Sequence, residues 1–303
     1  MKQSDNPLSL GGFQGSPLAT ELSENTRRLA AINAAAIDRP AETRIFTVAN
    51  QKGGVGKTTT AVNLAVALAE KGMNVLVIDL DPQGNASTAL GIDHHAVQGS
   101  IYDVLVGNVL LADVMQQSPE SVNLKCVPAT LMLAGAEMAL YPLSDREYRL
   151  KNAIQHYIQG TSEKPDYIFI DCPPSLGQLT VNALTAATEV LIPIQCEYYA
   201  LEGLSQLKVS IDMIKGQSNP GLALSTILLT MFNSRTRLNI AVVEDVRAHF
   251  PNQTLKTIIP RQIGVAEAPG YGKTVINYDR NSNGSISYME AAIEIANKGV
   301  QHG

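Results

Sequence analysis

The chain carries a glycine-rich turn between two apolar segments: Ala49-Asn50-Gln51-Lys52-Gly53-Gly54-Val55-Gly56-Lys57-Thr58-Thr59-Thr60. The preceding run, Ile45 to Val48, is short and β-branched, which is typical of a buried strand. The following apolar residues recur every three or four positions and so share one face of a helix: Ala61, Leu64, Ala65 and Leu68. The pattern predicts a strand, a turn and a helix in that order.

This strand, turn and helix form the context of a phosphate-binding loop. Glycines let the backbone curl until several N–H groups point inward, and the positive end of the following helix faces the same place. Lys57 adds a charge for the β- and γ-phosphates of a nucleotide, and the Thr58 hydroxyl adds a ligand for Mg²⁺. The general pattern has a glycine where this chain has Gln51, and a second lysine, Lys52, follows. The predicted nucleotide-binding residues are Gln51, Lys52, Gly53, Gly54, Val55, Gly56, Lys57, Thr58 and Thr59.

Length and composition are those of an ordinary soluble protein. The 303 residues allow one large α/β domain or two small ones, and 45% of them are hydrophobic. No stretch approaches the roughly 20 apolar residues of a membrane span, and Met1 to Asp5 do not lead into a signal-peptide core. We therefore expect a cytoplasmic protein without a membrane partner. The net charge of −5 means that nucleic-acid binding would need a local basic patch.

The cysteines give no sign of a disulfide framework or a zinc site. Cys126, Cys172 and Cys196 are widely separated, and none belongs to a CxxC pair. We expect buried, reduced thiols.

The first 42 residues differ in character from the rest of the chain. Glycines and prolines punctuate a polar stretch there, which predicts disorder up to about residue 20. Scattered apolar residues from Glu21 to Ile37 predict a short amphipathic helix, ended by Asp38-Arg39-Pro40, that either packs on the domain or meets a partner. We expect an N-terminal extension over residues 1–42 and a single domain over residues 43–303.

The remaining chain alternates between strand-like and helix-like segments. Alternation of this kind predicts an α/β fold with a mostly parallel, twisted sheet flanked by helices. The expected strands include Asn74 to Asp81, Leu124 to Pro128, Tyr167 to Asp171, Val190 to Gln195, Leu224 to Met231 and Leu255 to Ile259. The expected helices include Ile101 to Val106, Asp145 to Ile158, Gly203 to Ile214, Leu238 to His249 and Ser287 to Lys298.

Two of the expected strands end in aspartates, Asp79 with Asp81 and, later, Asp171. Ligands of parallel sheets bind outside the carboxyl ends of the strands, so these acids should lie near the phosphate loop. Asp171 is expected to hold Mg²⁺, usually through water, beside Thr58. Many ATP hydrolases follow this aspartate with a glutamate that orients the attacking water, whereas Cys172 stands here, so that Asp81 or Asp79 must supply the carboxylate. The predicted metal set is Thr58, Asp81 and Asp171, and the predicted catalytic set is Lys52, Lys57, Asp81 and Asp171.

Basic residues are enriched between Thr230 and Arg280. This segment contains seven basic and four acidic residues, a net charge of +3, whereas the whole chain has a net charge of −5. Such a patch could contact DNA phosphates, or it could be a solvated face. The seven are Arg235, Arg237, Arg247, Lys256, Arg261, Lys273 and Arg280.

With these motifs the chain resembles the ParA family of chromosome and plasmid partition ATPases, over roughly Arg44 to Lys298. The deviant phosphate loop is typical of a wider group of dimerising nucleotide switches, and four further segments narrow the resemblance to chromosomal, Soj-like members. They are Asp79-Leu80-Asp81-Pro82-Gln83-Gly84-Asn85, Asp171-Cys172-Pro173-Pro174-Ser175, Gln195-Cys196-Glu197-Tyr198-Tyr199-Ala200-Leu201-Glu202-Gly203 and Ala266-Glu267-Ala268-Pro269.

The resemblance implies a P-loop ATPase domain that binds ATP and Mg²⁺ and forms a homodimer with ATP between the subunits. Lys52 would reach the phosphates held by the other subunit, so nucleotide binding and dimerisation would be coupled. Asp81 matches the acid that orients the attacking water, and Asp171 matches the magnesium-linked acid. The family contacts adenine at the positions of Asn233, Pro260 and Arg261.

The resemblance also implies nonspecific DNA binding by the ATP dimer on the nucleoid, and slow hydrolysis stimulated by a ParB-like centromere-binding partner. Arg235 matches a family DNA contact. Gly264 stands where many relatives carry another arginine, so the DNA surface would shift toward Arg237, Lys256, Lys273 or Arg280.

Two other functions remain as alternatives. A MinD-like membrane-positioning ATPase needs a basic, amphipathic C-terminal helix, whereas Ser287 to Lys298 carries Glu290 and Glu294 with a single lysine. A metabolic, ATP-dependent ligase of the same fold needs a second substrate pocket, for which the sequence shows no residue cluster.

Overall fold

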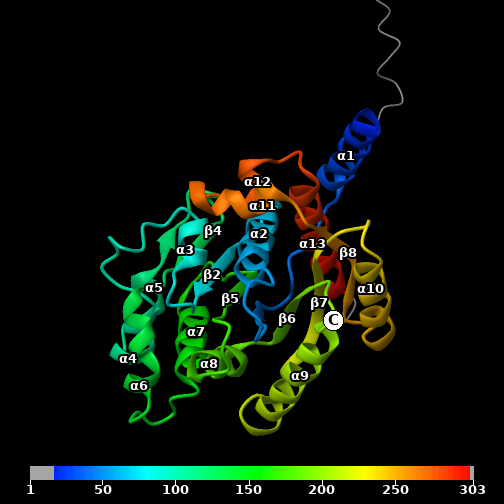
Figure 1. The fold of residues 1–303 in the computed structure, drawn as a ribbon. Helices are drawn as coiled ribbons and strands as arrows, with labels where there is room; N and C mark the ends of the chain where they lie inside the picture. The colour runs from blue at the N-terminus through cyan, green and yellow to red at the C-terminus, as the bar shows by residue number, and fades with distance from the viewer. Residues whose placement is uncertain (1–16, 301–303) are drawn as a thin grey trace, which may run out of the picture.

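One mostly parallel sheet of eight strands organises the computed structural model, which describes residues 17–300 (Figure 1). The spatial order is β3-β4-β2-β5-β1-β6-β7-β8, and β3 alone runs antiparallel to its neighbour. The predicted α/β class is therefore confirmed. The strands are β1 (Arg44–Val48), β2 (Val75–Asp79), β3 (Gln116–Gln117), β4 (Leu124–Val127), β5 (Tyr167–Asp171), β6 (Glu189–Gln195), β7 (Ala223–Phe232) and β8 (Thr254–Pro260).

Helices cover both faces of this sheet. The helices before β5 are α1 (Pro17–Ala34), α2 (Lys57–Glu70), α3 (Asn85–Ala89), α4 (Ile101–Gly107), α5 (Leu111–Val114), α6 (Ala136–Leu140) and α7 (Arg149–Gly160), with the 3₁₀ helix η2 (Leu131–Gly135). After β5 come α8 (Gln178–Ala186), α9 (Ala200–Gln217), α10 (Arg237–His249), α11 (Ile263–Glu267), α12 (Val275–Tyr278) and α13 (Asn283–Val300), with the 3₁₀ helix η3 (Ala268–Tyr271).

Two hydrophobic cores lie on opposite faces of the sheet. In β5, Ile168 and Ile170 belong to one core, and Tyr167 and Phe169 belong to the other. The first core is completed by α4 to α10, and the second by α2, α12 and α13. Because successive side chains of a strand point to opposite faces, a strand covered on both sides must be apolar throughout. This explains why the strands could be recognised as continuous apolar runs.

The observed elements follow the sequence closely, although α13 begins at Asn283 instead of Ser287 and another helix is shifted in the opposite direction. The helix expected from Asp145 begins at Arg149 instead. Asp145 has a φ of 55°, a left-handed conformation that a right-handed helix cannot contain. The three cysteines are buried and unpaired, as predicted.

The helix expected in the N-terminal extension is present as α1 and begins at Pro17, earlier than its expected start at Glu21. The predicted disorder of residues 1–16 lies outside the described residues. Figure 1 shows α1 projecting beside α13, and Arg28 forms an ion pair with Glu290 of that helix at 2.8 Å. Ile32 is buried in the second core. Helix α1 is therefore packed on the rest of the described structure through its second half.

The apolar side chains of the last helix, α13, are buried in the structure. Ile286, Tyr288 and Ile295 belong to the second core, and Glu294 accepts the backbone N–H groups of Lys256 and Thr257 at 2.7 and 3.0 Å. The apolar face of α13 is thus used inside the protein, which counts against the membrane-binding alternative. No helix within residues 17–300 combines the length and the hydrophobicity that crossing a membrane requires.

Candidate functional site

The glycine-rich turn joins β1 to the first residue of α2, as the sequence predicts. Gly54 and Gly56 have φ values of 75° and 90°, which only glycine adopts readily. A Cβ at either position would meet no atom within 4 Å, so backbone conformation rather than crowding requires glycine here. No side chain caps the start of α2 at Gly56. The first N–H groups of α2 therefore remain available to an anion such as a phosphate.

Lys57 is held inside this turn. Its side chain is only 7% exposed, and its Nζ donates a hydrogen bond to the carbonyl oxygen of Lys52 at 3.2 Å. Burial lowers the pKa of Lys57, whereas the nearby carboxylates of Asp171 and Asp81 oppose that shift. The ammonium is therefore placed over the loop, close to two acids and with part of its water removed.

Asp79 lies opposite Asp171 in the paired register of β2 and β5, and it is fully hydrogen-bonded. Its Oδ2 accepts the Ser87 backbone N–H at 2.8 Å and the Ser87 hydroxyl at 2.7 Å, and its Oδ1 accepts the Asp81 N–H at 3.1 Å. Burial raises the pKa of Asp79 to about 6, against the lowering effect of these bonds. Asp79 therefore joins β2 to α3, so of the two water-orienting candidates it is the less available.

Asp171 is equally buried, yet neither carboxylate oxygen has a hydrogen-bond partner within the described residues. Burial, and then the Asp79 carboxylate, raise the pKa of Asp171 well above its usual value. The Thr58 hydroxyl lies near enough to lower that pKa without meeting the geometry of a hydrogen bond. Buried polar groups are nearly always satisfied, so an unpartnered carboxylate needs an explanation. A hydrated Mg²⁺ beside Thr58 and Asp171 fits this arrangement.

The surrounding residues agree with a metal that is held only partly by protein. No group of three or more His, Cys, Asp or Glu side chains within residues 17–300 could hold an ion by itself. Mg²⁺ commonly keeps several waters and uses one or two carboxylates with substrate phosphates. The site therefore suits magnesium that arrives with a nucleotide.

Asp81 lies beyond Asp79, in the turn that follows β2. It is partly buried, and its Oδ1 accepts the N–H of Gln83 at 3.0 Å. The turn is closed by a bond from the Gly84 N–H to the Asp81 carbonyl oxygen at 2.9 Å. Unlike Asp79, the Asp81 side chain therefore remains accessible from solvent at the rim of the site.

Lys52 points away from the position of Lys57. Half of its side chain is exposed, and its ammonium forms an ion pair with Glu197, just before α9. Tyr198 and Tyr199 follow, with exposed fractions of 75% and 66%. Exposed aromatic side chains beside a charged residue are common at protein interfaces. Glu197 was part of a motif in the sequence, but no sequence signal connected it with Lys52.

The three candidate adenine contacts lie together at the carboxyl ends of β7 and β8. The N–H of Arg261, next to Pro260, donates to the Phe232 carbonyl oxygen at 2.9 Å, one residue before Asn233. The Thr230 hydroxyl in β7 donates to the Val55 carbonyl oxygen at 2.9 Å and so joins this edge to the phosphate loop. The neighbouring placement is as the resemblance implies, although it does not test a contact with adenine.

The five candidate DNA contacts do not form one cluster. Arg235 and Arg237 are exposed together where β7 leads into α10, on the edge that also holds Arg261. Lys256 lies earlier along β8, and Arg280 is bound to Glu70, at the end of α2 away from the phosphate loop, at 2.7 and 2.8 Å. Lys273 is exposed just before α12. Only Arg235 and Arg237 share a local surface with the nucleotide edge.

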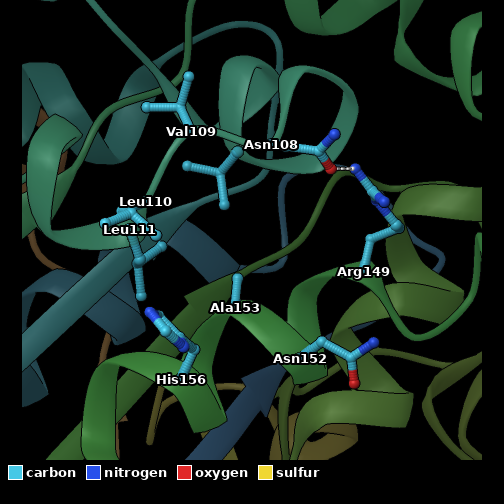
Figure 2. A pocket seen from close by; sticks show the side chains of 9 residues that line it. Asn108, Val109, Leu110, Leu111, Arg149, Asn152, Ala153 and His156 are labelled. Atoms are coloured by element: carbon cyan, nitrogen blue, oxygen red, sulfur yellow. Dashed lines mark hydrogen bonds between the residues drawn. The ribbon is translucent and has the colours of Figure 1, made fainter. Parts of the chain in front are cut away.

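Two hollows differ in their relation to this site. An open cleft of about 420 Å³ borders the loop and is lined by Thr58, Thr59, Val62, Asn85, Thr88, Ala89, Pro269 and Gly270. A second pocket, of about 220 Å³, lies between α4, α5 and α7 (Figure 2). Figure 2 shows Arg149 reaching Asn108 across its mouth, and its lining includes neither a carboxylate nor a residue of the phosphate loop. This pocket is therefore not a second substrate site connected to the phosphate loop, which the ligase alternative requires.

Comparison with known proteins places this geometry in a family. A family model described as an AAA domain matches residues 43–224. The sporulation initiation inhibitor protein Soj of Bacillus subtilis (strain 168) is 48% identical over 256 residues, which are 84% of this chain and 99% of that protein. The chromosome partitioning protein ParA of Myxococcus xanthus (strain DK1622) is 48% identical over 252 residues, 83% of this chain and 87% of that protein. This chain belongs to the ParA family.

A solved structure extends the comparison to three dimensions. Cobyrinic acid a,c-diamide synthase from Mycobacterium smegmatis, crystallised with ADP and magnesium and also with an ATP analogue and magnesium, has a TM-score of 0.71 and 38% identity. The match covers 83% of this chain and 93% of that one. The ParA-family chain is thus more similar in sequence to the two partition-type relatives than to this synthase. The helix α1 precedes the segment that the AAA model matches.

Proposed function

We propose that this ParA-family ATPase works as a nucleotide-gated DNA-partition switch, with residues 43–303 as its single ATPase domain and residues 1–42 as an extension. ATP with Mg²⁺ would bind at the phosphate loop of each subunit, and two subunits would close on each other around the nucleotides. The dimer would bind DNA nonspecifically on the nucleoid, and a ParB-like partner would stimulate its slow hydrolysis.

Support for Mg-ATP as the ligand comes from the inner part of the site. Lys57 and the uncapped start of α2 would neutralise phosphate charge, and Thr58 with Asp171 would hold the magnesium. Bound magnesium would draw charge from the phosphate oxygens as the terminal phosphate is released. Asp81 can accept a hydrogen bond from the attacking water, because its side chain is accessible and fixed by a closed turn.

The observation that carries the dimer proposal is the opposite placement of the two loop lysines. Lys57 is buried at the start of α2, whereas Lys52 is half exposed on a rim with two exposed tyrosines. A second subunit placed against this rim would bury those rings and offer its phosphates to Lys52. The charge would then act across the interface, which would couple ATP binding to dimerisation.

Lys52→Ala tests that coupling. ATP-dependent dimerisation, measured by sedimentation of the protein with Mg-ATP, should weaken by about 100-fold, since the charge lost would face phosphates across a buried interface. Nucleotide binding to the monomer should change by no more than about threefold, as expected for an exposed charge. Lys125→Ala is the matched control, because Lys125 is an exposed lysine on β4. Loss of nucleotide binding in the Lys52→Ala monomer would contradict the proposal.

DNA retention across a salt series tests the output of the switch. Binding should require ATP and should weaken steeply with salt, because phosphate contacts release counterions. Arg235→Gln should reduce the slope of log affinity against log salt by about 1, whereas Lys125→Gln, which changes an exposed lysine on β4, should leave it unchanged. Equal DNA affinity with and without ATP would reject the gated switch.

A further inference from the structure

His94 is a buried imidazole that follows α3, and no sequence motif marks it. It is 8% exposed. Its Nδ1 lies 3.1 Å from the Ala129 carbonyl oxygen, just beyond β4, and its Nε2 lies 3.2 Å from the Thr88 hydroxyl oxygen. Because a carbonyl only accepts hydrogen bonds, Nδ1 carries a proton. His95 stacks beside it at 4.2 Å between ring centroids but is exposed.

The imidazole also packs against the turn that carries Asp81. A Cβ built on Gly84 would come within 2.3 Å of His94 Cε1 and 2.5 Å of Nδ1, so the ring occupies the space where a side chain at Gly84 would be. Gly84 has a φ of 66° and closes the turn by its bond to the Asp81 carbonyl oxygen. The Gly84 carbonyl oxygen in turn accepts the Thr88 hydroxyl and N–H, each at 3.0 Å.

The contacts of His94 continue to the buried acid. The Ala129 N–H donates to the Ser87 hydroxyl oxygen at 3.2 Å, and that hydroxyl donates to Asp79 Oδ2 at 2.7 Å. Ala129, just beyond β4, is therefore held at its carbonyl oxygen by His94 and at its N–H by Ser87. The Asp81 turn therefore packs against an imidazole that is bound to the neighbouring strand end.

We propose that His94 is a positioning residue for ATP hydrolysis, which holds the Asp81 turn at the distance from the phosphate loop that the attacking water needs. This inference rests on the proposed function, in which Asp81 orients that water. Asp81 lies in a turn and not in a helix or strand, so packing behind Gly84 determines where its carboxylate stands. A displacement of about 1 Å in such a group can reduce turnover by about 100-fold.

His94→Ala, measured in the full chain with Mg-ATP, should lower kcat by about 10- to 100-fold. The KM for ATP should stay within about twofold, because Lys57 and Thr58 lie outside the hydrogen-bonded network of His94. His95→Ala removes the exposed neighbour and should leave both constants unchanged. An unchanged kcat in His94→Ala, or a rise in KM without a fall in kcat, would overturn the proposal.

His94→Asn separates positioning from a general loss of packing. Asparagine keeps a donor where Nδ1 stands and should still bind the Ala129 carbonyl oxygen, so kcat should recover to within about threefold of the wild type. A kcat that falls and recovers only in step with the melting temperature across both variants would show that His94 serves the fold alone.

Asp81→Ala distinguishes a failure of this inference from a failure of the proposed function. If His94 acts through Asp81, the double variant should hydrolyse ATP no more slowly than Asp81→Ala alone. A further loss in the double variant would overturn the role of His94. Normal turnover in Asp81→Ala would instead remove Asp81 as the water-orienting acid, whatever His94 does.

Discussion

β2 and β5 each end in an aspartate, and the two aspartates are paired in the register of the strands, but their carboxylates have different surroundings. Asp79 and Asp171 face each other across the strand pair, and both are 0% exposed. Asp79 accepts three hydrogen bonds, from Ser87 and from the Asp81 backbone. Asp171 accepts none within residues 17–300. Burial alone therefore does not separate the two acids, whereas their hydrogen bonds do.

Asp171→Asn should give the largest effect. Magnesium-dependent turnover should fall by about 100-fold, because the residue that would hold the metal loses its charge. The protein without nucleotide should become more stable near neutral pH, since burial and Asp79 raise the pKa of Asp171 and so disfavour its charged form. An ATP hydrolysis assay at varied Mg²⁺ concentration checks the first part, and thermal unfolding without nucleotide checks the second. Normal turnover together with lowered stability would show that Asp171 is structural, like Asp79.

Asp79→Asn should alter the pH dependence of stability. The pKa of Asp79 rises from 3.8 to about 6 on folding, so the folded state binds more protons than the unfolded state between these values. Stability from this group is present below about pH 4 and is lost as pH rises through about 6, by about 3 kcal/mol at most. Asparagine does not titrate. The stability advantage of the wild type over the variant should therefore shrink between pH 4.5 and 7 in urea unfolding, and a constant difference would contradict the assignment.

Ser87→Ala should give the smallest effect of the three. It removes the hydroxyl's hydrogen bond to Asp79 and the one that the hydroxyl accepts from the Ala129 N–H, with a loss of about 1–2 kcal/mol. Because the bond to Asp79 lowers the pKa of Asp79, the pH transition should also move upward. Ser285→Ala is the matched control, since the Ser285 hydroxyl is buried without a partner in the described part of the chain. Equal unfolding free energies for the two variants would mean that the Asp79 bonds contribute little.

The basic residues show where sequence position misleads. A charge of +3 between Thr230 and Arg280 suggested one patch. Folding separates these side chains, because the segment runs out along β7, back through α10 and again along β8, and Arg280 pairs with Glu70 from α2. Residues that are close in sequence therefore come to lie at opposite ends of a strand or beside another helix.

The sequence by itself determined the phosphate loop, the acids at the strand ends, the family and every strand of the described sheet except β3. These features depend on local rules: apolar runs for strands covered on both faces, left-handed glycines in a tight turn, and a lysine and threonine at a helix start. The start of α7 was misplaced because a left-handed Asp145 leaves no local signal.

Only the tertiary structure showed which acid is fully hydrogen-bonded, which is accessible to solvent and which has no hydrogen-bond partner within the described residues. Asp79, Asp81 and Asp171 are alike in sequence, and their difference comes from Ser87, from the Asp81 turn and from the absence of donors around Asp171. The pairing of Lys52 with Glu197 and the packing of His94 on Gly84 likewise join segments that are distant or unremarkable along the chain. Hydrogen-bond satisfaction and burial belong to the assembled molecule, because partners from several strands and loops must meet before they exist.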